Sequence, residues 1–260
     1  MMNLDAMIRW SKIVSAAIVA FLSAVIAGTP ATAAEIMTLC HANVRPALEA
    51  IIPAFERASG HKVTITYLPV PAIGQQIDSG ARVDLVIAFS ERMDDFIKGG
   101  KFPAGSRFEV VRSGIGVAVR SGAPKPDISS TRALKNALLG AKSLAFSRGP
   151  TGVHLMTVME RLGIAEQLKS RILMADPGLG SVGALVAKGE IEIGIHGIYE
   201  LVPVDGIDIV GPIPRDLQKI IVYSATVPAN AKEPEAAKTL VKFFASETAV
   251  PLLRTTGMEP

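Results

Sequence analysis

Short apolar runs alternate with helical segments along the chain, and this alternation is the strongest constraint on its fold. Apolar or period-two runs of strand length occupy residues 36–40, 63–67 and 84–88. Apolar residues recur at helical spacing over residues 44–59, 72–79 and 91–98, and a glycine follows each of these segments. This strand–helix–strand order predicts an α/β fold with mixed, mainly parallel sheets and helices on both faces.

The pattern starts again after a long extended stretch at 108–119. Further strands are predicted at 143–146, 192–196, 207–210 and 220–226, helices at 131–139, 152–162, 181–188 and 233–246, and a turn at 176–178. We therefore expect two lobes, lobe 1 over 34–114 and 224–260 and lobe 2 over 115–223, with hinge segments near 114–119 and 223–226. A cleft between two such lobes is the expected place for a ligand.

The first 33 residues have the order of a signal peptide. Arg9 and Lys12 precede an apolar run at 13–27, and small residues follow at 31–34. Cleavage after Ala33 or Ala34 would release an exported, periplasmic protein. The alternative is an uncleaved membrane anchor, although the run of about fifteen residues is short for a membrane helix of about twenty.

The charge balance and the cysteine count exclude two further features, nucleic-acid binding and an intramolecular disulfide. The 260 residues carry 27 Lys+Arg against 24 Asp+Glu, a net charge of +3 without a basic run, which argues against nucleic acid as a partner. Cys40 is the one cysteine, so no intramolecular disulfide can form, and we expect it to lie buried in the first strand.

The loop between the first strand and the first helix is one candidate anion site. Ala42 and Asn43 lie where unpaired backbone N–H groups of a helix start attract an anion, and Arg45 adds a positive charge in the first turn. Two alternatives stay open, a plain helix cap for Asn43 and a solvated surface arginine for Arg45.

A second candidate loop precedes the helix at 152–162. Ser147, Arg148, Thr151 and Gly152 combine hydroxyl groups, a guanidinium fork and exposed amides, which together suit a carboxylate or an oxyanion. The alternative is a Gly/Pro turn with a solvent-facing arginine. A third loop, Pro69-Val70-Pro71-Ala72, is rigid and apolar and offers chiefly backbone amides at a helix start.

The four histidines show no metal-ligand spacing, and no phosphate-binding loop or nucleophile elbow is present. We therefore predict no metal site and no cofactor. His196 ends a predicted strand and can reach the cleft, although a structural histidine is the alternative.

The chain resembles a type II periplasmic solute-binding protein of the molybdate-binding-protein-like branch. The resemblance rests on residues 55–60 (FERASG), 75–87 (QQIDSGARVDLVI), 183–186 (GALV) and 192–195 (EIGI), together with the Ala42-Asn43 loop. It implies a two-lobe fold with a hinge, a small anionic ligand, a monomer, and delivery to the membrane subunit of an ABC importer.

This chain departs from that family at the ligand loops. Asn43 and Pro69-Val70-Pro71 stand where molybdate binders have serines, so we favour an organic carboxylate as the ligand, with a molybdate-like oxyanion as the alternative. The same branch includes an aconitate isomerase, and this resemblance keeps an enzymatic alternative open, with His41 or His196 as the base and Arg45 and Arg148 as carboxylate partners. A third class, a surface adhesin, has no sequence feature in its favour.

Overall fold

The computed structural model describes residues 33–175 and 181–260, so residues 1–32 of the predicted signal peptide and the turn predicted at 176–178 lie outside it. The described strands are β1 (Glu35–His41), β2 (Lys62–Leu68), β3 (Leu85–Phe89), β4 (Phe108–Ser113), β5 (Ile115–Arg120), β6 (Leu144–Ser147), β7 (Ile172–Ala175), β8 (Ile193–Gly197), β9 (Ile207–Pro212) and β10 (Ile221–Thr226). The α-helices are α2 (Arg45–Ser59), α3 (Val70–Asp78), α4 (Ser90–Lys98), α5 (Thr131–Gly140), α6 (Pro150–Arg161), α7 (Ala165–Leu168), α8 (Ser181–Ala187), α9 (Ile198–Leu201), α10 (Pro234–Phe243) and α11 (Ala249–Arg254). Two 3-10 helices are η1 (Ala42–Val44) and η2 (Lys169–Arg171).

The long periodic segments match the predicted elements within a few residues. The predicted helix at 233–246 ends earlier, at Phe243, and the extended stretch at 108–119 divides into β4 and β5 at Gly114. The elements that sequence reasoning missed are β7, α7, α9 and α11. Each of them has six residues or fewer, which is too short for a periodic pattern to be distinctive.

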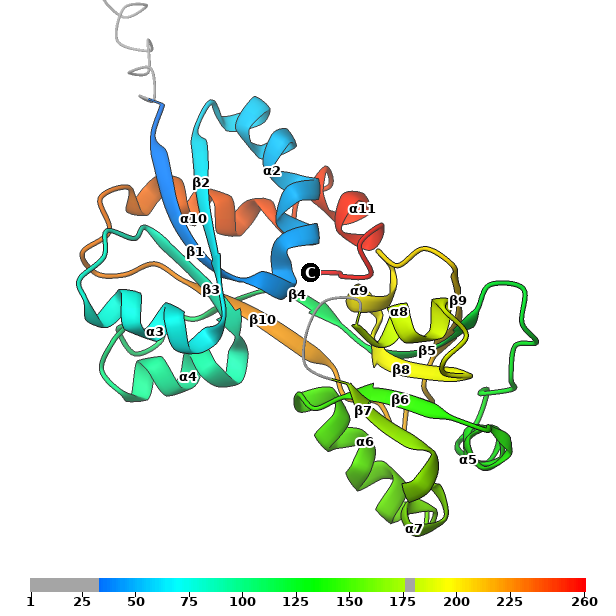
Figure 1. Cartoon of the computed structure of the whole chain (residues 1–260). Helices are drawn as coiled ribbons and strands as arrows, with labels where there is room; N and C mark the ends of the chain where they lie inside the picture. Colours follow the sequence, from blue (N-terminus) through cyan, green and yellow to red (C-terminus); the bar gives the residue numbers. More distant parts are fainter. Residues whose placement is uncertain (1–32, 176–180) are drawn as a thin grey trace, which may run out of the picture. The chain divides into compact units, whose positions relative to one another are not determined.

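The described strands form two sheets with the same plan (Figure 1). In the first, with order β2-β1-β3-β10-β4, β1 is parallel to β2 and β3, and β10 is antiparallel to β3 and β4. In the second, with order β7-β6-β8-β5-β9, β6 is parallel to β7 and β8, and β5 is antiparallel to β8 and β9. The sheets are mixed as predicted, but parallel and antiparallel pairings are balanced in the described residues, so "mainly parallel" was too strong.

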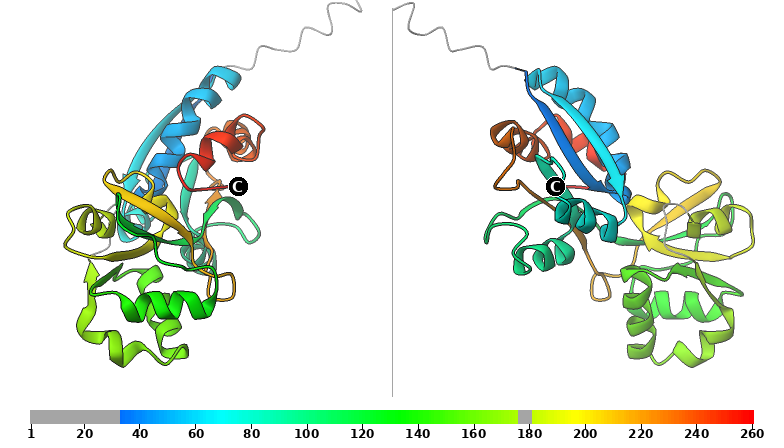
Figure 2. Two further views of the ribbon diagram at one scale, coloured as in Figure 1. Left: turned by 90° about the vertical axis from the view of Figure 1, so that its right-hand side faces the viewer. Right: turned by 60° about the vertical axis from the view of Figure 1, so that its left-hand side comes forward.

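Helices cover both faces of each sheet. Successive side chains along a strand point to opposite faces, and in these sheets they pack in different cores. In β3, Leu85 and Ile87 pack in the core that contains α2 and α10, whereas Val86 and Ala88 pack with α3 and α4 on the other face. Figure 2 shows α2 running along β1 and β2 in both views. In the second sheet, Ala145 packs on the side covered by α8.

The chain passes between the two sheets in two neighbouring segments. The first passage is at Gly114, between β4 and β5, and the second leads from β9 into β10. Gln218 joins the two, because its Oε1 accepts the N–H of Ile115 at 2.7 Å and its Nε2 donates to the Ile115 carbonyl at 3.0 Å. The whole of β10 from Ile221 lies in the first sheet, whereas the lobe boundary that we propose on the sequence falls at 223.

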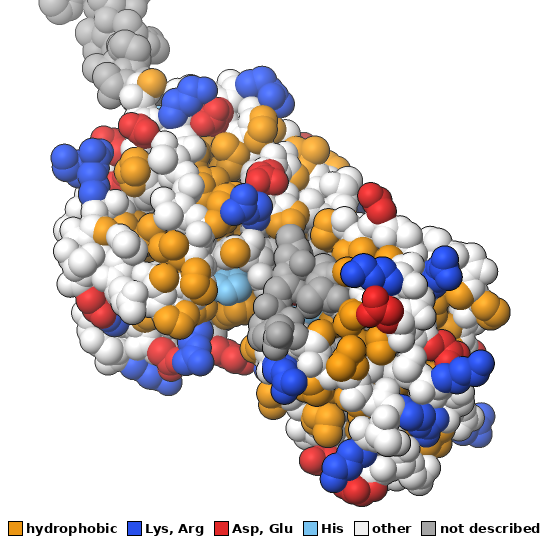
Figure 3. Space-filling model, viewed as in Figure 1, with side chains coloured by type: hydrophobic (Ala, Val, Ile, Leu, Met, Phe, Trp, Pro, Cys, Tyr) orange, Lys and Arg blue, Asp and Glu red, His pale blue; other side chains and the backbone are white. Residues whose placement is uncertain are grey.

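Cys40 is fully buried in β1 and unpaired, as predicted, and burial raises the pKa of its thiol. No helix in the two described segments has the length and apolar character to cross a bilayer. On the face shown in Figure 3, Lys/Arg and Asp/Glu side chains are interspersed over the surface.

Candidate functional site

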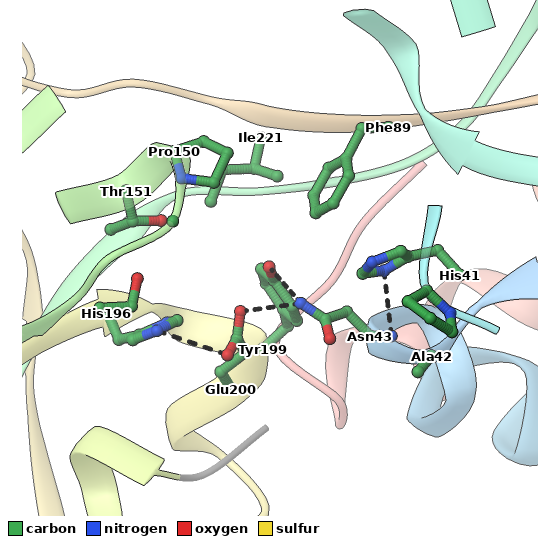
Figure 4. Close-up of a pocket in the computed structure, with 13 residues that line it drawn as sticks. His41, Ala42, Asn43, Phe89, Pro150, Thr151, His196, Tyr199, Glu200 and Ile221 are labelled. Atoms are coloured by element: carbon green, nitrogen blue, oxygen red, sulfur yellow. Dashed lines mark hydrogen bonds and ion pairs between the residues drawn. The ribbon is translucent and has the colours of Figure 1, made fainter. Parts of the chain in front are cut away.

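A pocket of about 360 Å³ lies where the strand ends of both sheets meet, a size typical of small-molecule sites. Its lining residues are His41, Ala42, Asn43, Pro69, Phe89, Ser147, Gly149, Pro150, Thr151, His196, Tyr199, Glu200 and Ile221. Figure 4 shows two different walls. Phe89, Pro150 and Ile221 lie on one side, and His196, Glu200 and Asn43 lie on the other.

His41 lies at the end of β1 and faces the pocket from the first sheet. Its Nδ1 accepts the backbone N–H of Asn43 at 3.3 Å, so it caps η1 and its ring proton belongs on Nε2. Its ring lies 4.6 Å from that of Phe89. Burial lowers the pKa of His41 to about 4, because the charged ring would lose its hydration. His41 is therefore a neutral hydrogen-bond donor at neutral pH.

Asn43 does not cap a helix, contrary to one of the two predicted roles. The N-cap position of α2 is Val44, without a side-chain hydrogen bond, and Pro46 occupies its first turn. The Asn43 amide instead points across the pocket, where Nδ2 donates to Glu200 Oε1 at 3.1 Å and to the Tyr199 hydroxyl oxygen at 3.4 Å. Asn43 thus joins the loop after β1 to α9.

The end of β6 and the start of α6 each place a hydroxyl-bearing residue at the pocket. Ser147 and Thr151 are both buried and both line it. Gly152 has a structural role instead, because a Cβ at this position would overlap the Ser147 carbonyl oxygen. This close approach of two backbone segments holds the start of α6 against β6.

His196 lies at the end of β8 and is almost fully buried, with 4% of its side chain exposed. Its Nδ1 accepts the N–H of Gly197 at 2.9 Å, which places the ring proton of the neutral form on Nε2. Burial lowers the pKa of His196 to about 4. Like His41, it is a neutral donor.

Glu200 lies on α9, four residues after His196 of β8, and its side chain is 5% exposed. Its Oε2 is 3.4 Å from His196 Nε2, yet the geometry makes no hydrogen bond, and both atoms lack a partner among the described residues. Burial raises the pKa of Glu200 to about 7, partly offset by a hydrogen bond with Tyr199. Glu200 can therefore gain or lose a proton near neutral pH.

Two tyrosines lie beside Glu200. The Tyr223 hydroxyl of β10 donates to the Tyr199 hydroxyl oxygen at 3.1 Å, and burial raises the pKa of both phenols well above 10. They stay protonated over the physiological range. Among the described residues, the polar wall of the pocket therefore consists of neutral groups and one carboxyl group.

Of the predicted ligand residues, Ala42, Asn43, Ser147, Thr151 and His196 line the pocket, and Arg45, Pro71, Ala72, Arg148 and Gly152 do not. Their roles in binding stay predictions.

The predicted ligand residues that do not line the pocket have other surroundings. The guanidinium of Arg45 lies over the Tyr67 ring, 4.1 Å from its centroid, and 3.9 Å from Glu49. The Ala72 N–H donates to the Pro69 carbonyl, so this amide already has an acceptor. Arg148 lines a neighbouring depression together with Glu91 and Lys219.

Tyr199, Glu200, Phe89 and Ile221 line the pocket but were missed by sequence reasoning. A four-residue helix carries Tyr199 and Glu200, and its start is not marked by a capping side chain. The nearness of both residues to His196, at the end of the predicted strand, was a weak signal for them. Among the described residues, no group of three or more His, Cys, Asp and Glu side chains could hold a metal ion.

Comparison with known proteins places the chain in a family. Residues 36–259 match the model of the bacterial extracellular solute-binding proteins. The chain is 34% identical to an aconitate isomerase of a Pseudomonas species over 247 residues, 90% of this chain and 93% of the relative. It is 26% identical to the molybdate-binding protein ModA of Azotobacter vinelandii over 246 residues, 92% and 96% of the two chains.

The fold agrees with this assignment. The solved structure of the periplasmic molybdate-binding protein of Azotobacter vinelandii superposes with a TM-score of 0.64 at 20% identity, covering 86% of this chain and 99% of that one. Both the sequence match over nearly all of the described residues and the two mixed sheets support the same conclusion. The chain belongs to the family of bacterial extracellular solute-binding proteins, in its ModA-like type II branch.

Proposed function

We propose that this protein is a periplasmic receptor that binds a small organic carboxylate between its two lobes and delivers it to the membrane subunit of an ABC importer. The family supports binding of a small solute outside the cytoplasm. The two-sided pocket supports an organic ligand and carries the proposal.

The two walls suit the two parts of an organic acid. Phe89 and Ile221 can bury the carbon skeleton. The neutral donors of His41 and Ser147, which also line the pocket, can bind carboxylate oxygens. A tetrahedral oxyanion has polar oxygens on every side and would leave some of them against the apolar wall, where an unpaired charged oxygen is costly.

A thermal-shift panel tests the proposal. The purified protein is heated with trans-aconitate, citrate, succinate, molybdate, sulfate and phosphate. A ligand at about 100 times its Kd should stabilise the fold by about 2.7 kcal/mol. We expect this from a carboxylate, and we expect Phe89→Ala to weaken it, whereas the exposed-site control Glu247→Gln should not. Tight binding of molybdate alone would contradict the carboxylate assignment.

A second candidate function, favoured by Glu200, is an isomerase that shifts a proton on a tricarboxylate. The 34% identical relative is an aconitate isomerase, and a carboxyl group with a pKa of about 7 suits a general base. Both histidines hold their proton on Nε2, so we assign the base to Glu200 rather than to His41 or His196.

The step balances without a cofactor. Ionised Glu200 takes a proton from the carbon next to the double bond, the double bond shifts, and Glu200–COOH returns the proton to the other end of the allylic system. Neutral donors stabilise the charge that develops on the neighbouring carboxylate. Incubation with trans-aconitate in D₂O, followed by NMR, should show deuterium uptake and cis product with the wild type but not with Glu200→Gln. Unlabelled, unconverted substrate would exclude catalysis and leave the receptor function.

A further inference from the structure

Glu200 has an unusual environment for a carboxyl group in a pocket that is proposed to bind an anion. Side chains from several elements lie near it: His196 of β8, Tyr199 of α9, Asn43 of η1 and Tyr223 of β10. All four are neutral around pH 7, because burial lowers the histidine pKa to about 4 and raises both tyrosine pKa values. None of these groups neutralises an ionised Glu200.

The same holds for the rest of the pocket. Among the residues that the structure describes, its lining contains one acid, Glu200, and no lysine or arginine, and His41 is also neutral. An ionised Glu200 and an ionised ligand would therefore place two like charges in a largely buried space, where repulsion is weakly screened. One proton between them removes this repulsion and replaces it with a hydrogen bond to a charged group.

We propose that an anion enters this pocket together with one proton, which is shared between the carboxyl group of Glu200 and an oxygen of the ligand. This deepens the proposed function and rests on it, since it takes the organic carboxylate as the ligand. The proton comes from solvent when both partners are ionised, and no bond to carbon changes. A ligand that brings its own hydroxyl or carboxyl proton needs none from solvent.

Glu200 is the group that can hold this proton. His196 already carries a proton on Nε2, so it could accept a second one only on Nδ1. It would then lose the hydrogen bond from the Gly197 N–H. Glu200 Oε1 accepts from Asn43, whereas Oε2 has no hydrogen-bond partner among the described residues. The pKa of Glu200, raised to about 7, means that protonation at physiological pH requires little work.

Isothermal titration calorimetry of the full protein with trans-aconitate tests the proposal without any variant. Titrations at about pH 8 in two buffers of different ionisation enthalpy give the number of protons taken up, which we expect to approach one. The Kd should also rise about tenfold per pH unit between about pH 7.5 and 9. Glu200→Gln should show no proton uptake and a Kd that is constant over this range, whereas Glu247→Gln should behave as the wild type.

The outcomes separate this inference from the function on which it rests. Binding by the wild type without proton uptake, or an unchanged pH dependence in folded Glu200→Gln, overturns the inference and leaves the receptor function intact. If Glu200→Gln binds trans-aconitate at pH 8 and the wild type does not, the inference is supported. If neither protein binds trans-aconitate or the other carboxylates of the panel at any pH, the carboxylate function and this inference fail together.

Discussion

Two buried carboxyl groups, Asp84 before β3 and Glu200 on α9, have opposite surroundings. Asp84 is fully buried, and its oxygens accept backbone N–H bonds from Met37, Lys232 and Glu233 at 2.8–3.0 Å, so it holds β1 and the start of α10 together. Glu200 receives one amide bond from Asn43, and its second oxygen has no hydrogen-bond partner among the described residues. A carboxyl group with its donors satisfied supports the fold, whereas one left short of donors is available to a ligand.

The largest effect is expected at Asp84. Asp84→Asn keeps the shape of the side chain but turns one acceptor into an amide donor, which then faces a backbone N–H. Because hydrogen bonds to a charged group are worth about 1.5–3 kcal/mol each, we expect a loss of roughly 3 kcal/mol in the free energy of unfolding. Urea denaturation measures it. If the variant's free energy of unfolding lies within 1 kcal/mol of the wild-type value, Asp84 does not stabilise the fold as this comparison states.

The matched change, Glu200→Gln, should stabilise the protein at alkaline pH. A pKa raised from 4.5 to about 7 means that the folded state loses stability relative to the unfolded chain as pH rises through this window. This loss of stability, which comes from ionising a buried carboxyl group, persists above pH 7. It is absent in Glu200→Gln, whose side chain does not ionise. Its stability relative to the wild type should therefore increase by about 3 kcal/mol from pH 4.5 to 8.

Paired urea denaturations of the two proteins at several pH values check this. The lowered pKa values of His41 and His196 act in the opposite direction, but they are common to both proteins and cancel in the difference. A difference that does not change with pH would show that Glu200 is not the buried titrating group.

Asn43→Ala sharpens the comparison by removing the one amide bond that Glu200 has. We expect the free energy of unfolding to fall by about 1 kcal/mol. The pKa of Glu200 should rise further, because a hydrogen bond to the ionised form is lost. NMR titration of the Glu200 side chain reports the pKa, and an unchanged value would mean that the Asn43 contact is not maintained in solution.

The smallest effect is expected at a helix start remote from the pocket. Ser130 Oγ accepts the Ala133 N–H and caps α5. Ser130→Ala should reduce stability by about 0.5–1 kcal/mol, since the side chain is exposed, and should leave ligand binding unchanged. A shift in the Kd for trans-aconitate would show that the pocket is coupled to this part of lobe 2.

Sequence reasoning could find the long elements and the loops that border the pocket, because amphipathic periods and glycine stops are local signals. It placed Asn43, Ser147, Thr151 and His196 at the pocket for this reason. It could not find the arginine positions, because the direction of a flexible side chain depends on tertiary neighbours such as Tyr67 beside Arg45. Glu200 was hidden in a four-residue helix, and its shifted pKa results from burial, which a local pattern does not report.

The tight backbone contact at Gly152 determines how this pocket can be redesigned. A side chain at Gly152 would push α6 away from β6 and so separate Thr151 from Ser147. A combinatorial library aimed at new analytes should therefore hold that position constant. Phe89 and Ile221, on the opposite apolar wall, are the positions to randomise. A biosensor built in this way would bind a new target while the hydroxyl groups of Ser147 and Thr151 keep their positions.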